Sequence, residues 1–180
     1  EYHREGLKGN NMVAAYKGFP VDLELVSDWD ADEVFRVSLH GELPVDQVIP
    51  VELLESEPLF GRASGSSLWD IGLGVVSVEG SDKRETWLDI YSGLEGISID
   101  LPAPFLKSSD QSWPMLVHYP IRTKNHVLTA DIPGRLQFKM ELSEEDNSPL
   151  RAAIQLDGKV KSMPEQGFFG IYGSTPIFDL

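Results

Sequence analysis

The sequence predicts an all-β, mostly antiparallel fold, an open or folded-over sheet with one or two short helices near residues 44–56. Three observations lead to this fold class. Apolar and polar side chains alternate with a period of two through most of the 180 residues, as they do in strands with one buried face. Helical periodicity is scarce. No long helix separates the alternating segments, so neighbouring strands are expected to pair antiparallel.

The first predicted strands are 21–26 and 35–40, and a long strand follows after a helical segment. The helical segment is 44–55, which Pro50 divides into two short turns. The long strand covers residues 63–75, and its glycines are expected to bend it or to form bulges. Its apolar positions include Trp69, Ile71, Leu73 and Val75.

The second half of the chain is predicted to form a meander of short strands. Strands 85–92 and 94–101 meet at Gly93-Leu94-Glu95-Gly96, where the apolar phase slips, and this segment is predicted to close a hairpin. The clearest alternation runs from Arg135 to Leu142, with Leu136, Phe138, Met140 and Leu142 as its apolar positions. The remaining predicted strands, which bring the number to ten, are 115–121, 127–132, 151–156 and 168–172.

The composition is that of an ordinary globular protein and makes nucleic acid a poor partner. Hydrophobic residues at 41% and charged residues at 24% predict one folded unit over residues 1–180. A formal net charge of −14 would repel phosphate backbones. There is no cysteine, and the longest stretch free of Asp, Glu, Lys and Arg, 166–178, is too short to span a bilayer. Because the chain starts without Met and ends in strand-like sequence, we expect it to be a segment excised from a longer protein.

No motif meets the spacing that an enzyme or a metal site requires, and no cofactor is predicted. Neither Ser64 nor Ser67 has glycine two residues away on both sides, as a nucleophile elbow needs. The acidic loop 28–32 has the odd spacing of a calcium site, but Glu33 stands where glycine is required. The histidines form no i, i+4 pair, and Gly72-Leu73-Gly74 lacks the rest of a phosphate loop. The sequence leaves open a catalytic site made of two carboxylates from distant strands, as glycoside hydrolases use.

Three glycine-led segments share features with a known family. From Gly93 to Lys107, a strand ends in Leu101-Pro102-Ala103-Pro104 and a lysine follows. The two prolines cannot donate ladder hydrogen bonds, so this motif also has an interpretation as a rigid strand end. Gly61 to Val75 and Gly167 to Gly173 supply the strands before and after it. Together these segments resemble the YhdP-like proteins of the AsmA-like, bridge-type lipid transfer group, best over 59–121.

The resemblance implies a middle piece of a long periplasmic protein whose inner-membrane anchor lies elsewhere in the parent chain. Such proteins form a long, bent, open β-sheet folded over an apolar groove, thought to carry phospholipid between the inner and outer membranes. The family has no catalytic residues, so the chain is not expected to be an enzyme. Its partners would be phospholipid acyl chains and the remainder of the same chain. The candidate lipid-groove residues are Trp69, Ile71, Leu73, Val117, Tyr119, Leu136, Phe138 and Met140.

Two other functions stay open beside lipid transport. A structural or partner-binding β module of the cell envelope would show the same alternation, because a compact sandwich buries the residues that a groove exposes. A carbohydrate-binding or carbohydrate-active domain would need an exposed aromatic platform beside carboxylates. The one local candidate for such a platform in the sequence is Trp29 with its flanking aspartates.

Overall fold

The computed structural model describes residues 2–3, 6–28, 33–49, 60–77, 84–122, 126–145 and 148–174, and in this part of the chain it forms a twelve-stranded sheet. The helical elements are α1 (Val45–Val48) and the 3-10 helix η1 (Phe60–Arg62). The strands are β1 (Tyr2–His3), β2 (Gly6–Tyr16), β3 (Phe19–Ser27), β4 (Glu33–Pro44), β5 (Ala63–Ser77), β6 (Arg84–Ser92), β7 (Ile97–Ile99), β8 (Met115–Arg122), β9 (Val127–Ile132), β10 (Leu136–Leu142), β11 (Pro149–Leu156) and β12 (Phe169–Tyr172).

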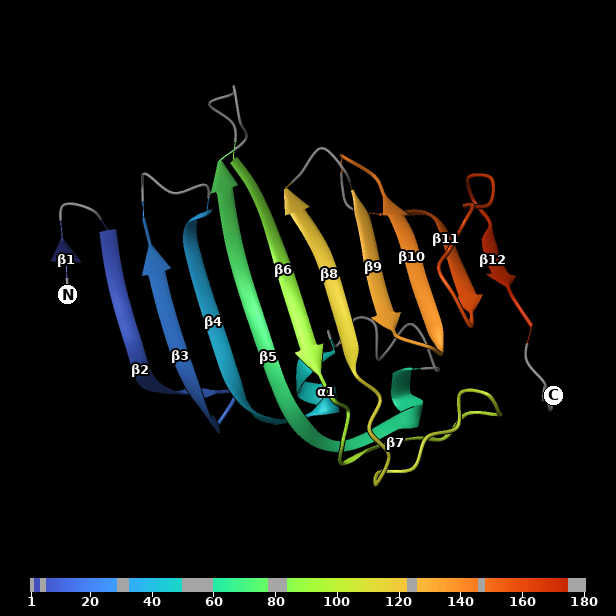
Figure 1. The fold of residues 1–180 in the computed structure, drawn as a ribbon, viewed down its shortest axis with the longest axis horizontal. Coiled ribbons are helices and arrows are strands. Elements are labelled where there is room, and N and C mark those ends of the chain that lie inside the picture. Colours follow the sequence, from blue (N-terminus) through green and yellow to red (C-terminus); the bar gives the residue numbers. More distant parts are fainter. Residues whose placement is uncertain are drawn as a thin grey trace.

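The strands lie side by side in the order of the chain, with β7 outside this path (Figure 1). Each strand pairs antiparallel with its neighbour, except that β12 pairs parallel with β11. A parallel pair needs a crossover connection, which residues 157–168 supply here. The prediction of an open, mostly antiparallel all-β fold is therefore confirmed, and β12 departs from the simple meander.

Most predicted strands are present with bounds shifted by a few residues. The clearest alternation forms β10, and the predicted long strand forms β5, which has 15 residues. Strand β2 is not among the predicted strands. Its first half is rich in glycine and asparagine, and its pairing with β3 shifts register between Gly9 and Met12. The glycines of this strand were expected to give bends or bulges, and at Gly72 and Gly74 the pairing of β5 with β4 and β6 continues without a register shift.

Strand β5 is long enough to pair with three strands, β4, β6 and β7. Its residues Trp69 to Ser77 pair with β6, and its residues Ala63 to Gly65 pair with β7. The predicted hairpin between residues 85–92 and 94–101 is therefore wrong, because β6 and β7 both pair with β5 instead of with each other. Residues 93–96 carry the chain from one of these partners to the other, and the predicted strand 94–101 shortens to Ile97–Ile99.

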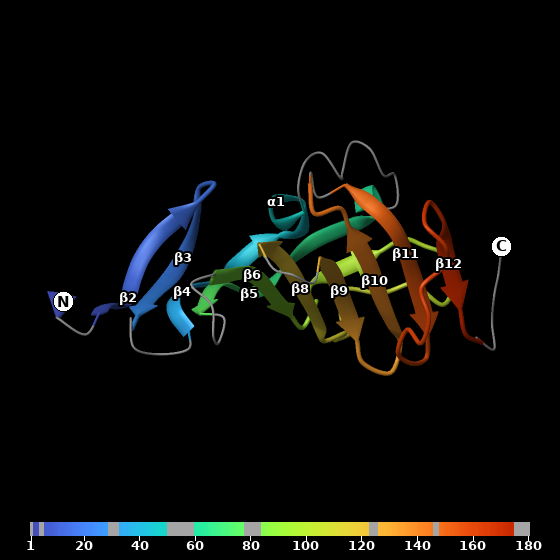
Figure 2. The same ribbon diagram turned by 90° about the horizontal axis from the view of Figure 1, so that it is seen from above.

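One end of the sheet's apolar face is covered by α1 and by the segment around β7. The buried cluster that joins them to the sheet consists of Val21, Leu43, Val45, Trp69, Leu94, Ile97, Trp113 and Ile132. Helix α1 lies behind β5 and β6 in Figure 1 and to one side of the curved sheet in Figure 2. It corresponds to the first of the two helical turns predicted near residues 44–56. Residues 50–59, and Trp29 with Asp30 and Asp32, lie outside the described residues.

Candidate functional site

All eight candidate groove residues lie on one face of the sheet. Residues that are direct partners in a ladder point to the same face, as do residues two apart in one strand. Ile71 is paired through Ile90 with Val117, and Val117 is paired through Ala130 with Phe138. Leu73 reaches Tyr119 in the same way through Leu88. Trp69 lies two residues from Ile71 in β5 and therefore points to the same face. Leu136 and Met140 point to this face as well, because each lies two residues from Phe138 in β10.

A continuous row of partner residues crosses this face and is apolar at every position. It takes one residue from each of β2 to β6 and β8 to β12. The row, called the apolar row below, is Met12, Leu23, Leu39, Ile71, Ile90, Val117, Ala130, Phe138, Ile154 and Ile171. Strands lie about 4.8 Å apart, so the nine steps of the row extend about 43 Å. The sequence alone gave the alternation in each strand but not this alignment between strands.

The eight candidates divide into a covered group and a more open group. Trp69 is 2% exposed and belongs to the buried cluster, and Ile71 and Leu136 pack against that cluster. The other five are partly buried and lie outside this cluster: Leu73, Val117, Tyr119, Phe138 and Met140. Other parts of the protein therefore cover the apolar face at one end of its strands. No described segment covers the remainder of this face completely. The charged residue Arg84 borders this remainder, at the outer end of β6.

Lys107 lies buried within the segment that covers this end of the apolar face, a position that its sequence does not predict. Lys107 is 1% exposed, and its Nζ donates hydrogen bonds to the carbonyl oxygens of Leu94 at 2.7 Å, Ile97 at 2.7 Å and Ser108 at 3.1 Å. These three bonds use all the donors of the ammonium group. Burial lowers the pKa of Lys107 below its usual range, against the opposing effect of the Asp110 and Glu95 carboxylates.

Trp113 closes the same end of the face. Its ring is 3% exposed, with the guanidinium of Arg135 at 4.1 Å and Lys107 Nζ at 6.0 Å from the ring centroid. Its backbone N–H donates to the carbonyl oxygen of Gly93 at 2.8 Å. The segment after the Leu-Pro-x-Pro motif thus folds back over the sheet and is held there by a buried cation and an aromatic ring.

Within the described ranges, no group of three or more His, Asp and Glu side chains is placed to hold a metal ion. Two cross-strand pairs on the polar face do join a histidine to an aspartate. His40 Nδ1 lies 2.6 Å from Asp70 Oδ1, and His118 Nδ1 lies 2.6 Å from Asp89 Oδ1. None of the helices described here is both long enough and apolar enough to cross a membrane.

Comparison with protein-family models matches residues 1–180 to the family described as YhdP protein. Neither the curated proteins nor the solved structures give a match to this chain.

Proposed function

Because the chain belongs to the YhdP protein family over its whole length, we propose that it is a non-enzymatic segment of a phospholipid transport protein in the periplasm. In this proposal the apolar face is a groove that holds acyl chains on their way between the inner and outer membranes. The remainder of the parent chain would anchor the protein in the inner membrane and continue the groove.

The observation that carries this proposal is the apolar row. A core only has to be apolar where elements meet, whereas a conduit has to be apolar without interruption along the direction of transport. The row meets that requirement over ten strands and about 43 Å. Each methylene moved from water onto such a surface contributes about 0.8 kcal/mol, so a shallow groove that covers several methylenes can hold an acyl chain.

The sealed end fits the same proposal. Lys107, Trp113 and α1 close one side of the apolar face, while Leu73, Tyr119 and Met140 stay partly exposed on the other. A groove with one closed wall and one open side lets acyl chains lie on the sheet while their headgroups remain in water. A compact sandwich would need a second layer over these same residues.

Site-specific photo-crosslinking in cells that make the whole protein tests the proposal. A photoreactive residue at Val117, in the apolar row, is expected to form adducts with phospholipid. The matched control is the neighbouring position Leu116, which is also apolar and is 49% exposed but points to the opposite face. Adducts at Val117 are expected to fall when Phe138→Asp places an unpaired charge in the row.

The control for Phe138→Asp is Lys139→Asp, which introduces an aspartate at the next residue of β10, on the polar face. It should leave the adducts at Val117 unchanged, and both variants must accumulate to the level of the unchanged protein. Equal lipid adducts at Val117 and Leu116, or adducts that survive Phe138→Asp in a folded protein, would contradict transport along the apolar row. A structural or partner-binding envelope module would then be the better description.

A further inference from the structure

The polar face of the sheet has a floor made of glycines. Gly72 and Gly74 of β5 point to this face, opposite the apolar row. A Cβ at Gly72 would lie 3.1 Å from a guanidinium nitrogen of Arg36, and a Cβ at Gly74 would lie 2.8 Å from two carbons of the Trp87 indole. The side chains of the neighbouring strands therefore lie flat across β5, an arrangement in which an aromatic ring covers a glycine in the adjacent strand.

The indole of Trp87 is held in this position by a hydrogen-bonded chain. Trp87 Nε1 donates to Asp89 Oδ2 at 3.0 Å, and the other oxygen of the same carboxylate lies 2.6 Å from Nδ1 of His118. The Trp87 and His118 rings have their centroids 6.5 Å apart. One carboxylate thus orients two rings, and because Asp89 uses Nδ1 of His118, the ring's other nitrogen remains to meet a ligand.

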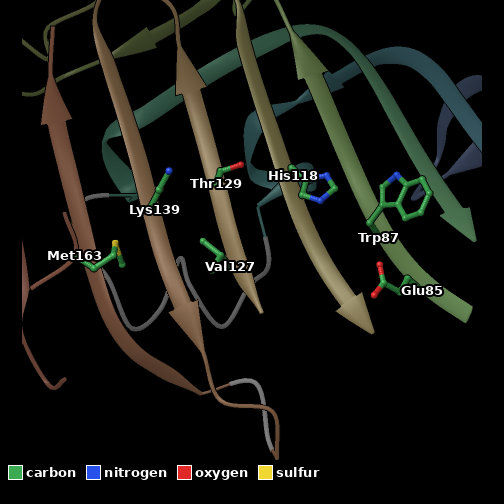
Figure 3. Close-up of a pocket in the computed structure, with 7 residues that line it drawn as sticks. All are labelled: Glu85, Trp87, His118, Val127, Thr129, Lys139 and Met163. Carbon is green, nitrogen blue, oxygen red and sulfur yellow. The ribbon is translucent and has the colours of Figure 1, made fainter. Parts of the chain in front are cut away.

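These two rings line a hollow of about 590 Å³ on the polar face (Figure 3). Its wall carries side chains of several hydrogen-bonding types: Glu85, Thr129 and Lys139, with Val127 and Met163 as its apolar members. The labelled side chains come from β6, β8, β9, β10 and the crossover before β12 (Figure 3). A second hollow of about 620 Å³ adjoins it through His118 and includes Tyr91, Asp89, Asp70, Ser38 and Arg36.

From this geometry we propose that the polar face binds an oligosaccharide, with Trp87 as the stacking platform. One face of a sugar ring carries C–H groups that pack on an aromatic ring, and its rim of hydroxyls both donates and accepts hydrogen bonds. The hollow offers that combination: a fixed indole, one carboxylate acceptor, one lysine donor, and hydroxyl and imidazole groups that can donate or accept. The adjoining hollow, with the ring of Tyr91 that is 47% exposed, gives room for further sugar units.

The same features disfavour other ligand classes. In the adjoining hollow the carboxylates of Glu24, Asp70 and Asp89 outnumber the guanidinium of Arg36 and oppose a phosphate or a nucleic acid, while the hollow beside Trp87 is lined by one carboxylate and one ammonium group. An acyl chain gains little from a wall of charged and hydroxyl side chains, and the apolar face lies on the other side of the sheet. A cationic peptide is the remaining competitor, because acidic side chains would attract it.

Binding of short β-linked hexose and N-acetylhexosamine oligomers to the purified chain tests the proposal by calorimetry and by saturation-transfer NMR. We expect saturable binding that Trp87→Ala weakens by roughly tenfold or more, the loss expected when a buried ring face is removed. Gly74→Ala is a milder second variant, because the added methyl group lifts the indole without removing it. Its matched control is Gly61→Ala, where a Cβ meets nothing within 4 Å.

Circular dichroism and the unfolding midpoint establish that each variant is folded. Saturation-transfer signals from sugar C–H protons are expected to disappear in Trp87→Ala and to persist in Phe138→Asp, which alters only the apolar face. Absence of binding by every oligomer tested, binding that Trp87→Ala leaves unchanged, or binding of an oligolysine peptide in place of sugars would overturn the proposal. None of these results would bear on acyl-chain binding, which uses the opposite face.

Discussion

At the scale of single residues, Lys107 is a buried cation that donates hydrogen bonds to the carbonyl groups of Leu94, of Ile97 in β7 and of the adjacent Ser108, within the segment that covers one end of the apolar face. We predict that Lys107→Met destabilises the chain by roughly 2 kcal/mol, because it leaves buried carbonyl groups without their donor while keeping most of the side-chain volume. The exposed Lys159 supplies the matched control, since Lys159→Met removes a lysine that is in contact with water. Urea unfolding measures both; equal midpoints for the two variants would contradict the assigned role.

The sequence placed Lys107 in a motif but could not predict what the residue does. The two prolines of Leu101-Pro102-Ala103-Pro104 indicate the end of a strand from local chemistry alone. The acceptors of Lys107 come from positions 94, 97 and 108, and only the path of the folded chain brings them around one nitrogen. A lysine is ordinarily exposed, so nothing in its local sequence distinguishes it from a surface residue.

At the scale of elements, two glycines allow β5 to approach the turn that leads into β7. Gly65 has φ +107°, and a Cβ on it would lie 2.2 Å from the carbonyl oxygen of Gly96, which itself has φ +88°. We predict that Gly65→Ala separates β7 from β5, because neither the backbone angle nor the space admits a methyl group. Hydrogen exchange should then quicken at the amide of Asp100, directly after β7, which donates to the carbonyl oxygen of Arg62, directly before β5, at 2.9 Å.

The control for this prediction separates the clash from the backbone angle. Gly18 also has a positive φ, +91°, but a Cβ there meets nothing within 4 Å, so Gly18→Ala carries only the cost of the angle, about 1–3 kcal/mol. Gly65→Ala should destabilise the chain by more than Gly18→Ala does. Unchanged exchange at Asp100 in Gly65→Ala would show that the pairing of β7 with β5 does not depend on this close approach.

Elements were predictable from the sequence where alternation was strong, and their partners were not. Period-two patterns located β3 to β6 and β8 to β12 because a half-buried strand must alternate. The same patterns contain nothing about which strands pair, so β6 and β7 were wrongly joined as a hairpin. The missed strand β2 begins with Gly6-Leu7-Lys8-Gly9, where glycines and a register shift break the alternation.

At the scale of the whole molecule, the sheet separates two chemistries on its two faces. Alternation was enough to put all eight candidate residues on one face, because one phase holds through each strand. The alignment of ten strands into the apolar row depends on ladder register, which turns, bulges and the crossover before β12 set together. The polar hollow around Trp87 could not be predicted either, since its floor requires Gly74 and Trp87 to be neighbours across β5 and β6.

A partly exposed apolar face of this length leads to a last prediction, on ligand-dependent stability. A lysophospholipid that binds the folded chain and not the unfolded one stabilises it by about 2.7 kcal/mol at a hundred times its Kd. For a chain of 180 residues this corresponds to a rise in Tm of about 5–10 °C. Differential scanning calorimetry below the critical micelle concentration measures the rise, with each variant compared to itself without lipid. The rise should be lost in Phe138→Asp and kept in Lys139→Asp, because the two positions are adjacent in β10 but face opposite sides of the sheet. An equal rise in both variants would mean that the lipid binds elsewhere than the apolar row.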